Sequence, residues 1–200
     1  MYISDDDAKG LGNVFVVDPA NPSTAQWSFH TNLGGLGDSN PENVDPEDVA
    51  VDPVSHHLFI TNGFSRTIQE IAVDQTNHTV SFVDSFVLSD PSIIDPEAIA
   101  YDAAHDVFLV GGGFSANIWV VDRHGDTLET LTLLQSYRNT HTSAPSGSIR
   151  TSVKDIEVAP ASDGSGETHI YVADFGNSHQ MDGRLIEINP GNLFSDLLIA

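Results

Sequence analysis

Short apolar runs separated by turn residues dominate the hydrophobic pattern of this chain. The clearest unit, Asp95–Asp122, contains three apolar runs rich in β-branched and aromatic residues, with Asp, Gly, Asn and Ser between them. The same unit occurs about fifty residues earlier, at Asp45–Asp74. These residue types favour strands and turns, and an all-strand repeat of this length is typical of a β-propeller blade. No helix is expected, because Gly and Pro are frequent and the helical spacing of apolar residues is lacking.

Alignment of the repeats predicts where the strands of each blade lie. First strands are expected to begin near Glu47, Glu97 and Lys154; second strands at Met1–Asp5, Leu58–Asn62, Val107–Gly111 and Ile170–Asp174; third strands at Val14–Asp18, Glu70–Asp74, Trp119–Asp122 and Ile186–Asn189; and outer strands at Ala25–Thr31, Thr79–Leu88, Thr127–Leu134 and Leu193–Ile199. The pattern predicts an all-β fold, with one complete or partial β-propeller domain of four-stranded blades over residues 1–44, 45–94, 95–151 and 152–200.

The number of blades in the whole ring stays open. One interpretation is that these blades are part of a six-bladed ring in a longer protein with other domains. The other is a compact four-bladed ring that contains one incomplete blade.

The charge balance restricts the possible partners. The chain has 29 Asp and Glu residues against 7 Lys and Arg, a formal net charge of −22. Nucleic acid and anionic membrane surfaces are therefore not expected to bind, and no apolar run is long enough for membrane insertion. Two explanations of the acidity remain, a solvated surface of a secreted or salt-adapted protein and a set of carboxylates that binds Ca²⁺. The absence of cysteine excludes disulfides and thiol chemistry.

Carboxylates recur where the inner strands begin. They are Asp45, Glu47 and Asp48 in the second blade, Asp95 and Glu97 in the third, and Asp155 and Glu157 in the fourth. Inner strands line the channel of a propeller, so these side chains are expected to converge and to need a cation or protons. The alternative is that the Asp-Pro-Glu residues only form the turn that leads into a strand. Lys154, which takes the place of a glutamate, is expected to neutralise a neighbour such as Glu97.

Three other features are candidates for a binding or catalytic role. Asn62 and Asp174 follow second strands, and the glycines 111–113 would leave an opening beside Glu97 through which a ligand could enter. His141 lies in a long loop that would overhang the channel, and it is the histidine chosen as a catalytic candidate. The loop Asp163–Glu167 is a weak match to a peripheral Ca²⁺ site. Nucleophile-elbow, zinc-protease, phosphate-loop and dinucleotide motifs are absent from the sequence.

The repeated motif resembles a known group of propellers. Pro-Glu-x-(Ile/Val)-Ala-(Tyr/Val)-Asp, then a strand centred on Phe or Tyr, then Ile-x-x-(Ile/Val)-x-Val-Asp is similar to NHL-type and gluconolactonase-like propellers. Val153–Asp163, Ile170–Asp174 and Asp182–Ile188 look most like the SdiA-regulated and phytase-esterase-like modules of secreted bacterial proteins that also carry RTX repeats. The resemblance implies a channel metal held by Glu, Asn and Asp from different blades, and the matching residues are Glu47, Glu97, Asn62 and Asp174.

Two functions follow from these observations. The first is a secreted, acidic, Ca²⁺-dependent binding module that takes a small-molecule, protein or glycan ligand at the channel face. The alternative is a metal-dependent hydrolase of lactones, esters or phosphate esters, in which Glu47 or Glu97 activates water. In the hydrolase the metal ligands would be Glu47, Asn62, Glu97, Asp155 and Asp174, and His141 would be a further catalytic candidate. The expected location is extracellular or on a bacterial surface, with any export signal upstream of this sequence.

Overall fold

The computed structural model describes residues 1–6, 13–33, 45–113, 115–133, 153–175 and 183–191. Within these ranges the chain forms strands and no helix, as the hydrophobic pattern predicted. The strands are β1 (Tyr2–Ser4), β2 (Val14–Asp18), β3 (Asn21–Phe29), β4 (Pro46–Val51), β5 (Leu58–Asn62), β6 (Thr67–Asp74), β7 (Thr79–Val87), β8 (Pro96–Asp102), β9 (Val107–Gly112), β10 (Asn117–Val121), β11 (Thr127–Thr132), β12 (Val153–Pro160), β13 (Thr168–Asp174) and β14 (Arg184–Ile188).

Two sequence predictions fall outside the described residues, the outer strand at Leu193–Ile199 and the loop that contains His141. Across the ranges that are described, no helix is long and apolar enough to cross a membrane.

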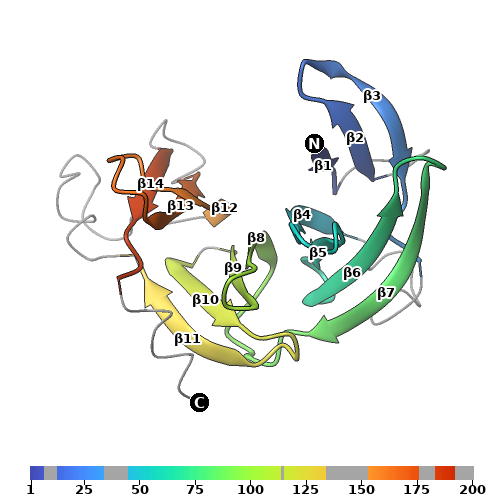
Figure 1. The fold of residues 1–200 in the computed structure, drawn as a ribbon. Coiled ribbons are helices and arrows are strands. Elements are labelled where there is room, and N and C mark those ends of the chain that lie inside the picture. Colours follow the sequence, from blue (N-terminus) through green and yellow to red (C-terminus); the bar gives the residue numbers. More distant parts are fainter. Residues whose placement is uncertain (7–12, 34–44, 114, 134–152, 176–182, 192–200) are drawn as a thin grey trace.

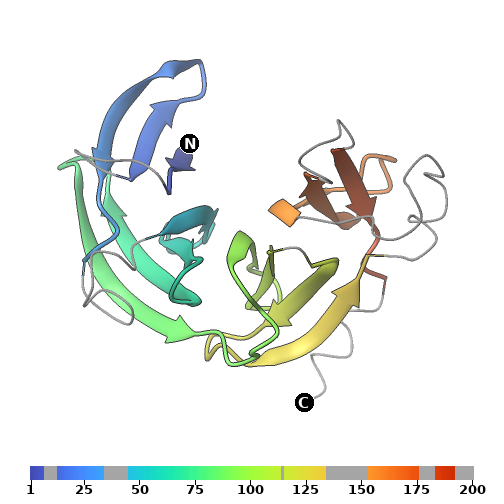
Figure 2. The same ribbon diagram turned by 180° about the vertical axis from the view of Figure 1, so that it is seen from behind.

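Consecutive strands pair in antiparallel fashion into four sheets, β1–β3, β4–β7, β8–β11 and β12–β14. The sheets follow one another along an arc, with β1, β4, β8 and β12 on its inner side and β3, β7 and β11 on its outer side (Figures 1 and 2). Strand β8 packs beside both β4 and β12. Antiparallel meanders arranged radially in this way are the blades of a β-propeller, so the predicted fold class is confirmed.

The core lies between neighbouring sheets, and this explains the apolar runs. Strand β9 is buried along its whole length, whereas the outer strands β7 and β11 are mostly exposed or half-buried. A middle strand is covered on both faces by the adjacent blades, so it needs apolar residues at every position. Between the second and third sheets the rings of Phe59 and Phe108 meet edge-on, with their centroids 4.7 Å apart. Such aromatic pairs add to the stabilisation from burial.

Arg123, in the turn after β10, joins the second and third sheets. Its guanidinium carbon lies 5.0 Å from the ring centroid of Phe59 and 5.2 Å from that of Tyr101. Its Nε donates to Asp106 at 2.6 Å, and Nη1 lies 3.4 Å from Glu70 Oε2. A cation held over aromatic rings and between carboxylates of two blades fixes how those blades pack together.

The glycines at the end of β9 allow close packing and leave no opening, so the prediction of a ligand entrance there was wrong. A Cβ on Gly111 would lie 2.6 Å from Val153 Cγ1. A Cβ on Gly112 would lie 2.2 Å from the carbonyl oxygen of Asp95 and 2.4 Å from the nitrogen of Glu97. Both glycines are buried. They are needed because the inner strands β8 and β12 pack directly against this segment.

Candidate metal centre at the start of the inner strands

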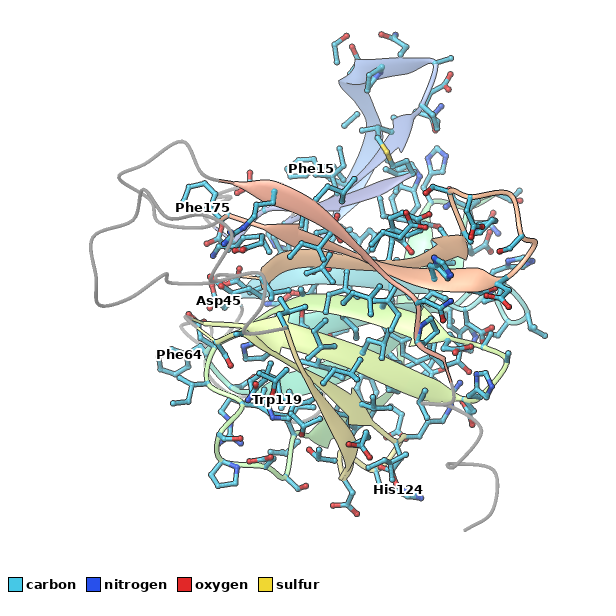
Figure 3. The ribbon with its side chains drawn as sticks, turned by 90° about the vertical axis from the view of Figure 1, so that its left-hand side faces the viewer. Phe15, Asp45, Phe64, Trp119, His124 and Phe175 are labelled. Atoms are coloured by element: carbon cyan, nitrogen blue, oxygen red, sulfur yellow. The ribbon has the colours of Figure 1, made fainter. Side chains whose placement is uncertain are left out.

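The ends of the strands that carry the candidate residues lie on one face of the molecule. Figure 3 shows Asp45, Phe64 and Phe175 at one end of the strands and His124 toward the other end. Strands β4 and β8 begin at this face, each at the proline of an Asp-Pro pair, Asp45-Pro46 and Asp95-Pro96. Asp95 has a positive φ of 54°, a left-handed conformation that Asp tolerates better than most residues. The repeated turn therefore brings equivalent acids of two blades to one edge.

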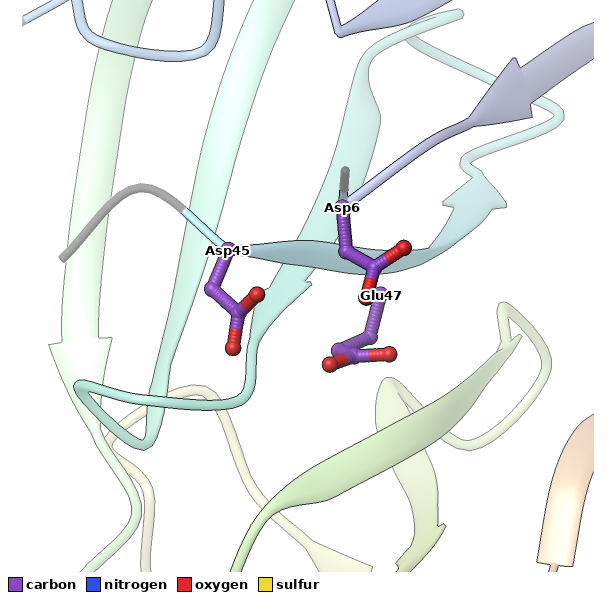
Figure 4. A group of neighbouring side chains, drawn as sticks. All are labelled: Asp6, Asp45 and Glu47. Atoms are coloured by element: carbon purple, nitrogen blue, oxygen red, sulfur yellow. The ribbon is translucent and has the colours of Figure 1, made fainter. Parts of the chain in front are cut away.

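Five carboxylates gather there, and we call them the acidic cluster: Asp6, Asp45, Glu47, Asp95 and Glu97. Each of Asp6, Asp45 and Glu47 offers an oxygen, and these oxygens all lie within 4.8 Å of one another (Figure 4). Asp6 follows β1 of the first sheet, while Asp45 precedes β4 of the second sheet and Glu47 is the second residue of that strand. Carboxylate oxygens this close, supplied by separate segments, are the hard ligands that Ca²⁺ takes in proteins.

Gly63, in the turn after β5, makes room for three members of the cluster. Around the position that a Cβ on Gly63 would take, Asp95 Oδ1 lies at 2.7 Å, and Asp45 Oδ2 and Glu47 Oε1 both lie at 3.0 Å. The amide of Gly63 also donates to the carbonyl oxygen of Asp45 at 3.1 Å. A side chain at this position would displace the carboxylates, so the glycine shapes the cluster.

The electrostatics of the cluster favour a bound cation. The pKa of Glu47 is raised to about 7, first by burial and then by the charges of Asp45, Asp6, Glu97 and Asp95. A carboxylate in such a place gains either a proton or a cation, because like charges repel when they are brought together out of water. The residues fit a hard divalent ion, because all the ligand atoms that they offer are oxygens. Burial and the neighbouring carboxylates also disfavour the ionised form of Glu47 unless a positive charge is close to it.

Glu97 differs from the other members because it has a basic partner. Lys154 of β12 forms an ion pair with Glu97 Oε1, as the sequence predicted. The side chain of Glu97 is only 12% exposed, and its Oε2 is buried without a hydrogen-bond partner among the described residues. Burial, and to a lesser extent the charge of Asp95, raise the pKa of Glu97, whereas Lys154 and the backbone amide of Gly113 oppose the shift. One oxygen is thus held in place while the other remains available for a proton.

Two of the other three predicted metal ligands have partners elsewhere, and the third is exposed. Asn62 Oδ1 accepts from the amide of Ser65 at 2.9 Å and so closes the turn after β5. The buried carboxylate of Asp174 pairs with Arg184, with Nη2 at 2.9 Å and Nε at 3.0 Å from Asp174 Oδ2. Asp155 lies on the exposed side of β12. The structure therefore brings Glu47 and Glu97 into one cluster and gives Asn62 and Asp174 structural partners.

Asp48 links two blades. Its Oδ2 accepts from the amide of Ile99 on β8 at 2.9 Å, and its Oδ1 accepts from the amide of Val49 at 2.7 Å. The pKa of Asp48 is raised to about 7, because burial outweighs these two hydrogen bonds and the charges of Asp155 and Glu157 add to it. Its role is to tie β4 to β8, which holds the start of both strands in register.

Three members of the cluster, Asp6, Asp45 and Asp95, were not named among the metal ligands, although Asp45 and Asp95 belonged to the carboxylates that were expected to converge. The sequence carried a signal for two of them, since Asp-Pro-Glu occurs at the same place in two repeats. Turn chemistry explained that motif equally well, because Asp before Pro favours a turn. Asp6 lies in the acidic turn after a second strand, for which turn chemistry and ligand binding were both open, and the packing of β1 beside β4 places it in the cluster.

No protein-family model matches the chain, and no curated protein matches it. Among solved structures, it is similar to Kuenenia stuttgartiensis hydrazine synthase, with a TM-score of 0.39 and 15% identity, over 72% of this chain and 36% of that chain. It is also similar to a periplasmic gluconolactonase of Pseudomonas aeruginosa, PpgL, with a TM-score of 0.48 and 11% identity, over 96% of this chain and 50% of that chain. The chain spans half or less of the length of both, and the likeness is one of fold.

Proposed function

We propose that this protein is a metal-dependent hydrolase of ester or lactone bonds, with Ca²⁺ bound by Asp6, Asp45 and Glu47 and with Asp95 beside them. The observation that carries the proposal is the convergence of these carboxylates from three blades: Asp45, Glu47 and Asp95 surround Gly63, and Asp6 lies beside Asp45 and Glu47. The raised pKa of Glu47, which comes from burial first and then from the neighbouring carboxylates, supports it, since a cation would stabilise the charged form. When bound, the cation supplies a positive charge that polarises a carbonyl oxygen.

In this proposal Glu97 is the general base. Lys154 holds Glu97 Oε1, so the unpartnered Oε2 is the atom that takes a proton from water. A base works best when its pKa lies near the working pH, and burial moves the pKa of Glu97 upward. Lys154 also keeps the ionised form populated, because its ammonium group stabilises the carboxylate.

Two exposed apolar side chains adjoin the acidic cluster and define a preference among substrates. Phe64 follows Gly63 and Ile94 precedes Asp95, and each is 67% exposed. Phe64→Ala is expected to raise KM about tenfold for an ester with an aryl or long acyl group and to leave kcat nearly unchanged. The apolar contact that it removes would stabilise the bound substrate and the transition state equally. Steady-state kinetics with aryl and acetyl esters would check this. An equal rise in KM for both substrates would contradict an apolar subsite.

A second candidate is a Ca²⁺-dependent binding module with the same cation site. The ion pair between Lys154 and Glu97 favours it, since a base occupied by a lysine is less free to activate water. In that case the cation and Phe64 would bind a small molecule, a protein or a glycan. The proposed location is outside the cell, where modules with weak calcium sites are loaded.

One experiment separates the two candidates. The protein is stripped with EDTA, its melting temperature is measured with and without Ca²⁺, and turnover is then measured on an aryl ester, a sugar lactone and an aryl phosphate. For the hydrolase we expect a Ca²⁺-dependent rise in melting temperature and a turnover that falls roughly 10²- to 10⁴-fold in Glu97→Gln. Glu129→Gln, on the outer strand β11, is the matched control and should behave as the wild type.

A Ca²⁺-dependent rise in melting temperature without turnover on any of the three substrates would contradict the hydrolase and support the binding module. No effect of Ca²⁺ on the melting temperature at millimolar concentration would contradict both candidates.

A further inference from the structure

Every basic side chain in the described part of the chain already has a partner within the protein. Arg66 donates to the carbonyl oxygens of Leu88 and Asp90, Arg123 pairs with Asp106 and Glu70, Lys154 with Glu97, and Arg184 with Asp174. Lys154 and Arg184 lie at the end of the strands that carries the acidic cluster, since β12 begins and β13 ends there. A carboxylate or phosphate group of a ligand would have to compete with a protein carboxylate for either of them.

The acidic cluster stays negatively charged when its proposed cation is bound. Five ionised carboxylates carry five negative charges, of which a Ca²⁺ ion would offset two and Lys154 offsets a third. Two negative charges remain, and Asp95 supplies one of them because it is not one of the three proposed calcium ligands. Strand β12 adds Asp155 and Glu157, both exposed, directly after Lys154. Charges of one sign gathered in this way attract ligands of the opposite sign and repel ligands of the same sign.

An exposed aromatic ring adjoins these carboxylates. Phe64 directly follows Gly63, and the carboxylates of Asp45, Glu47 and Asp95 surround Gly63. The side chain of Phe64 is 67% exposed and lies at the same end of the strands as Asp45 (Figure 3). The face of an aromatic ring attracts an organic ammonium group, and carboxylates beside the ring add to that attraction. An apolar surface alone would not distinguish a cationic ligand from a neutral one.

We propose that the ligand of this site carries an organic ammonium group, which Asp95 and the ring of Phe64 recognise beside the cation site. The inference rests on the proposed function and deepens it by naming the substrate class, which is esters or lactones with a cationic acyl group. Phosphate esters and acyl groups that end in a carboxylate are then poor substrates, because the cluster repels them and the basic side chains at this end are paired. A binding module would have the same preference, since the preference depends on the charge of the site and not on turnover.

The first test compares three aryl esters with the same leaving group, whose acyl chains end in a trimethylammonium, a tert-butyl or a carboxylate group. At saturating Ca²⁺, kcat/KM is expected to be highest for the ammonium ester, about tenfold lower for the tert-butyl ester and lowest for the carboxylate ester. The differences should shrink as the ionic strength rises toward about 1 M. The second test needs no turnover. Calorimetry at saturating Ca²⁺ should show benzyltrimethylammonium binding about tenfold or more tightly than phenylacetate.

Asp95→Asn is the decisive variant, because Asn also tolerates the positive φ of 54° at this position and only the charge is lost. It should weaken the binding of benzyltrimethylammonium roughly 3- to 10-fold. Phe64→Leu keeps an apolar side chain without a ring and should weaken that binding roughly 2- to 5-fold. Glu129→Gln removes one charge from the exposed part of β11, so it should bind the ammonium probe as the wild type does. Melting curves check that each variant is folded.

Equal affinity for the two probes would overturn the inference whether or not an ester is turned over. Equal kcat/KM for the three esters would also overturn it, while the turnover itself would still support the hydrolase. Tighter binding of phenylacetate would contradict it and would mean that the Ca²⁺ ion itself receives an anionic group. Ammonium binding that depends on Asp95, without turnover of any ester, would support the inference and contradict the hydrolase.

Discussion

Gly112→Ala is expected to destabilise the protein by about 3 kcal/mol or more, the largest effect on stability that we predict. The new Cβ would lie 2.2 Å from the carbonyl oxygen of Asp95 and 2.4 Å from the nitrogen of Glu97. Both neighbours are backbone atoms of the segment that leads into β8, so no rotamer change can relieve the clash. Gly112 also has a φ of +151°, which side-chain-bearing residues rarely adopt.

Urea denaturation followed by circular dichroism would measure this effect, and Gly164→Ala is the matched control. Gly164 has a φ of +74°, but a Cβ there would meet nothing within 4 Å. The control should therefore lose only about 1 kcal/mol, the penalty of the backbone conformation alone. An equal decrease in the free energy of unfolding in the two variants would mean that the clash with the Asp95–Glu97 backbone does not contribute to the destabilisation.

Glu47→Gln is expected to abolish stabilisation by Ca²⁺ and, if the protein is the proposed hydrolase, most of its turnover. The same substitution should make the metal-free protein more stable above neutral pH. Glu47 is crowded by Asp45 and Asp6, and the folded chain accommodates its charged form poorly. Glutamine keeps the size of the side chain and removes the charge. The variant should therefore lose Ca²⁺ binding, and its metal-free form should be more stable than the metal-free wild type.

The pH dependence of that gain follows from the pKa of Glu47, which is about 7 in the folded protein against an ordinary value of 4.5. Between these two values the folded state holds more protons than the unfolded state, so the stability contributed by this group falls as the pH rises. Below that window both states are protonated and the variant matches the wild type. Above it the penalty is complete, and the gain in Glu47→Gln is about 1 kcal/mol once solvent screening is allowed for.

Urea denaturation at pH 4, 6 and 8 in EDTA, repeated at pH 8 with Ca²⁺, would measure these differences. Glu129→Gln serves again as the control, because Glu129 lies on the outer strand and lacks the crowding of the acidic cluster. A variant whose advantage over the wild type is the same at every pH would show that the charge of Glu47 is not what destabilises the apo protein. Unchanged Ca²⁺ stabilisation in Glu47→Gln would place the cation elsewhere.

The local pattern was sufficient to predict the strands. Phe59 and Phe108 sit in apolar runs flanked by turn residues, and those runs became β5 and β9 because a blade covers its middle strands on both faces. The pairing of Lys154 with Glu97 was also predictable, since both residues occupy the same place in adjacent repeats and adjacent repeats pack side by side.

Contacts between neighbouring strands could not be derived in the same way. Asp174 looked like a channel ligand, but Arg184 on the next strand pairs with it. The glycines 111–113 looked like an opening, but the backbone of Asp95–Glu97 fills the space beside them. In each case the deciding atom belongs to another strand, and its distance is not encoded in the spacing of residues along one strand.

The sequence by itself determined the all-β repeat, the acidity and the placement of Glu47 and Glu97 where inner strands begin, because side-chain alternation and turn chemistry are local properties. Only the tertiary structure decided that Asp45 and Asp95 join Glu47 around Gly63, and that Asp6 lies beside Asp45 and Glu47. These groupings depend on how separate strands and sheets pack, and packing brings together residues that no local pattern relates.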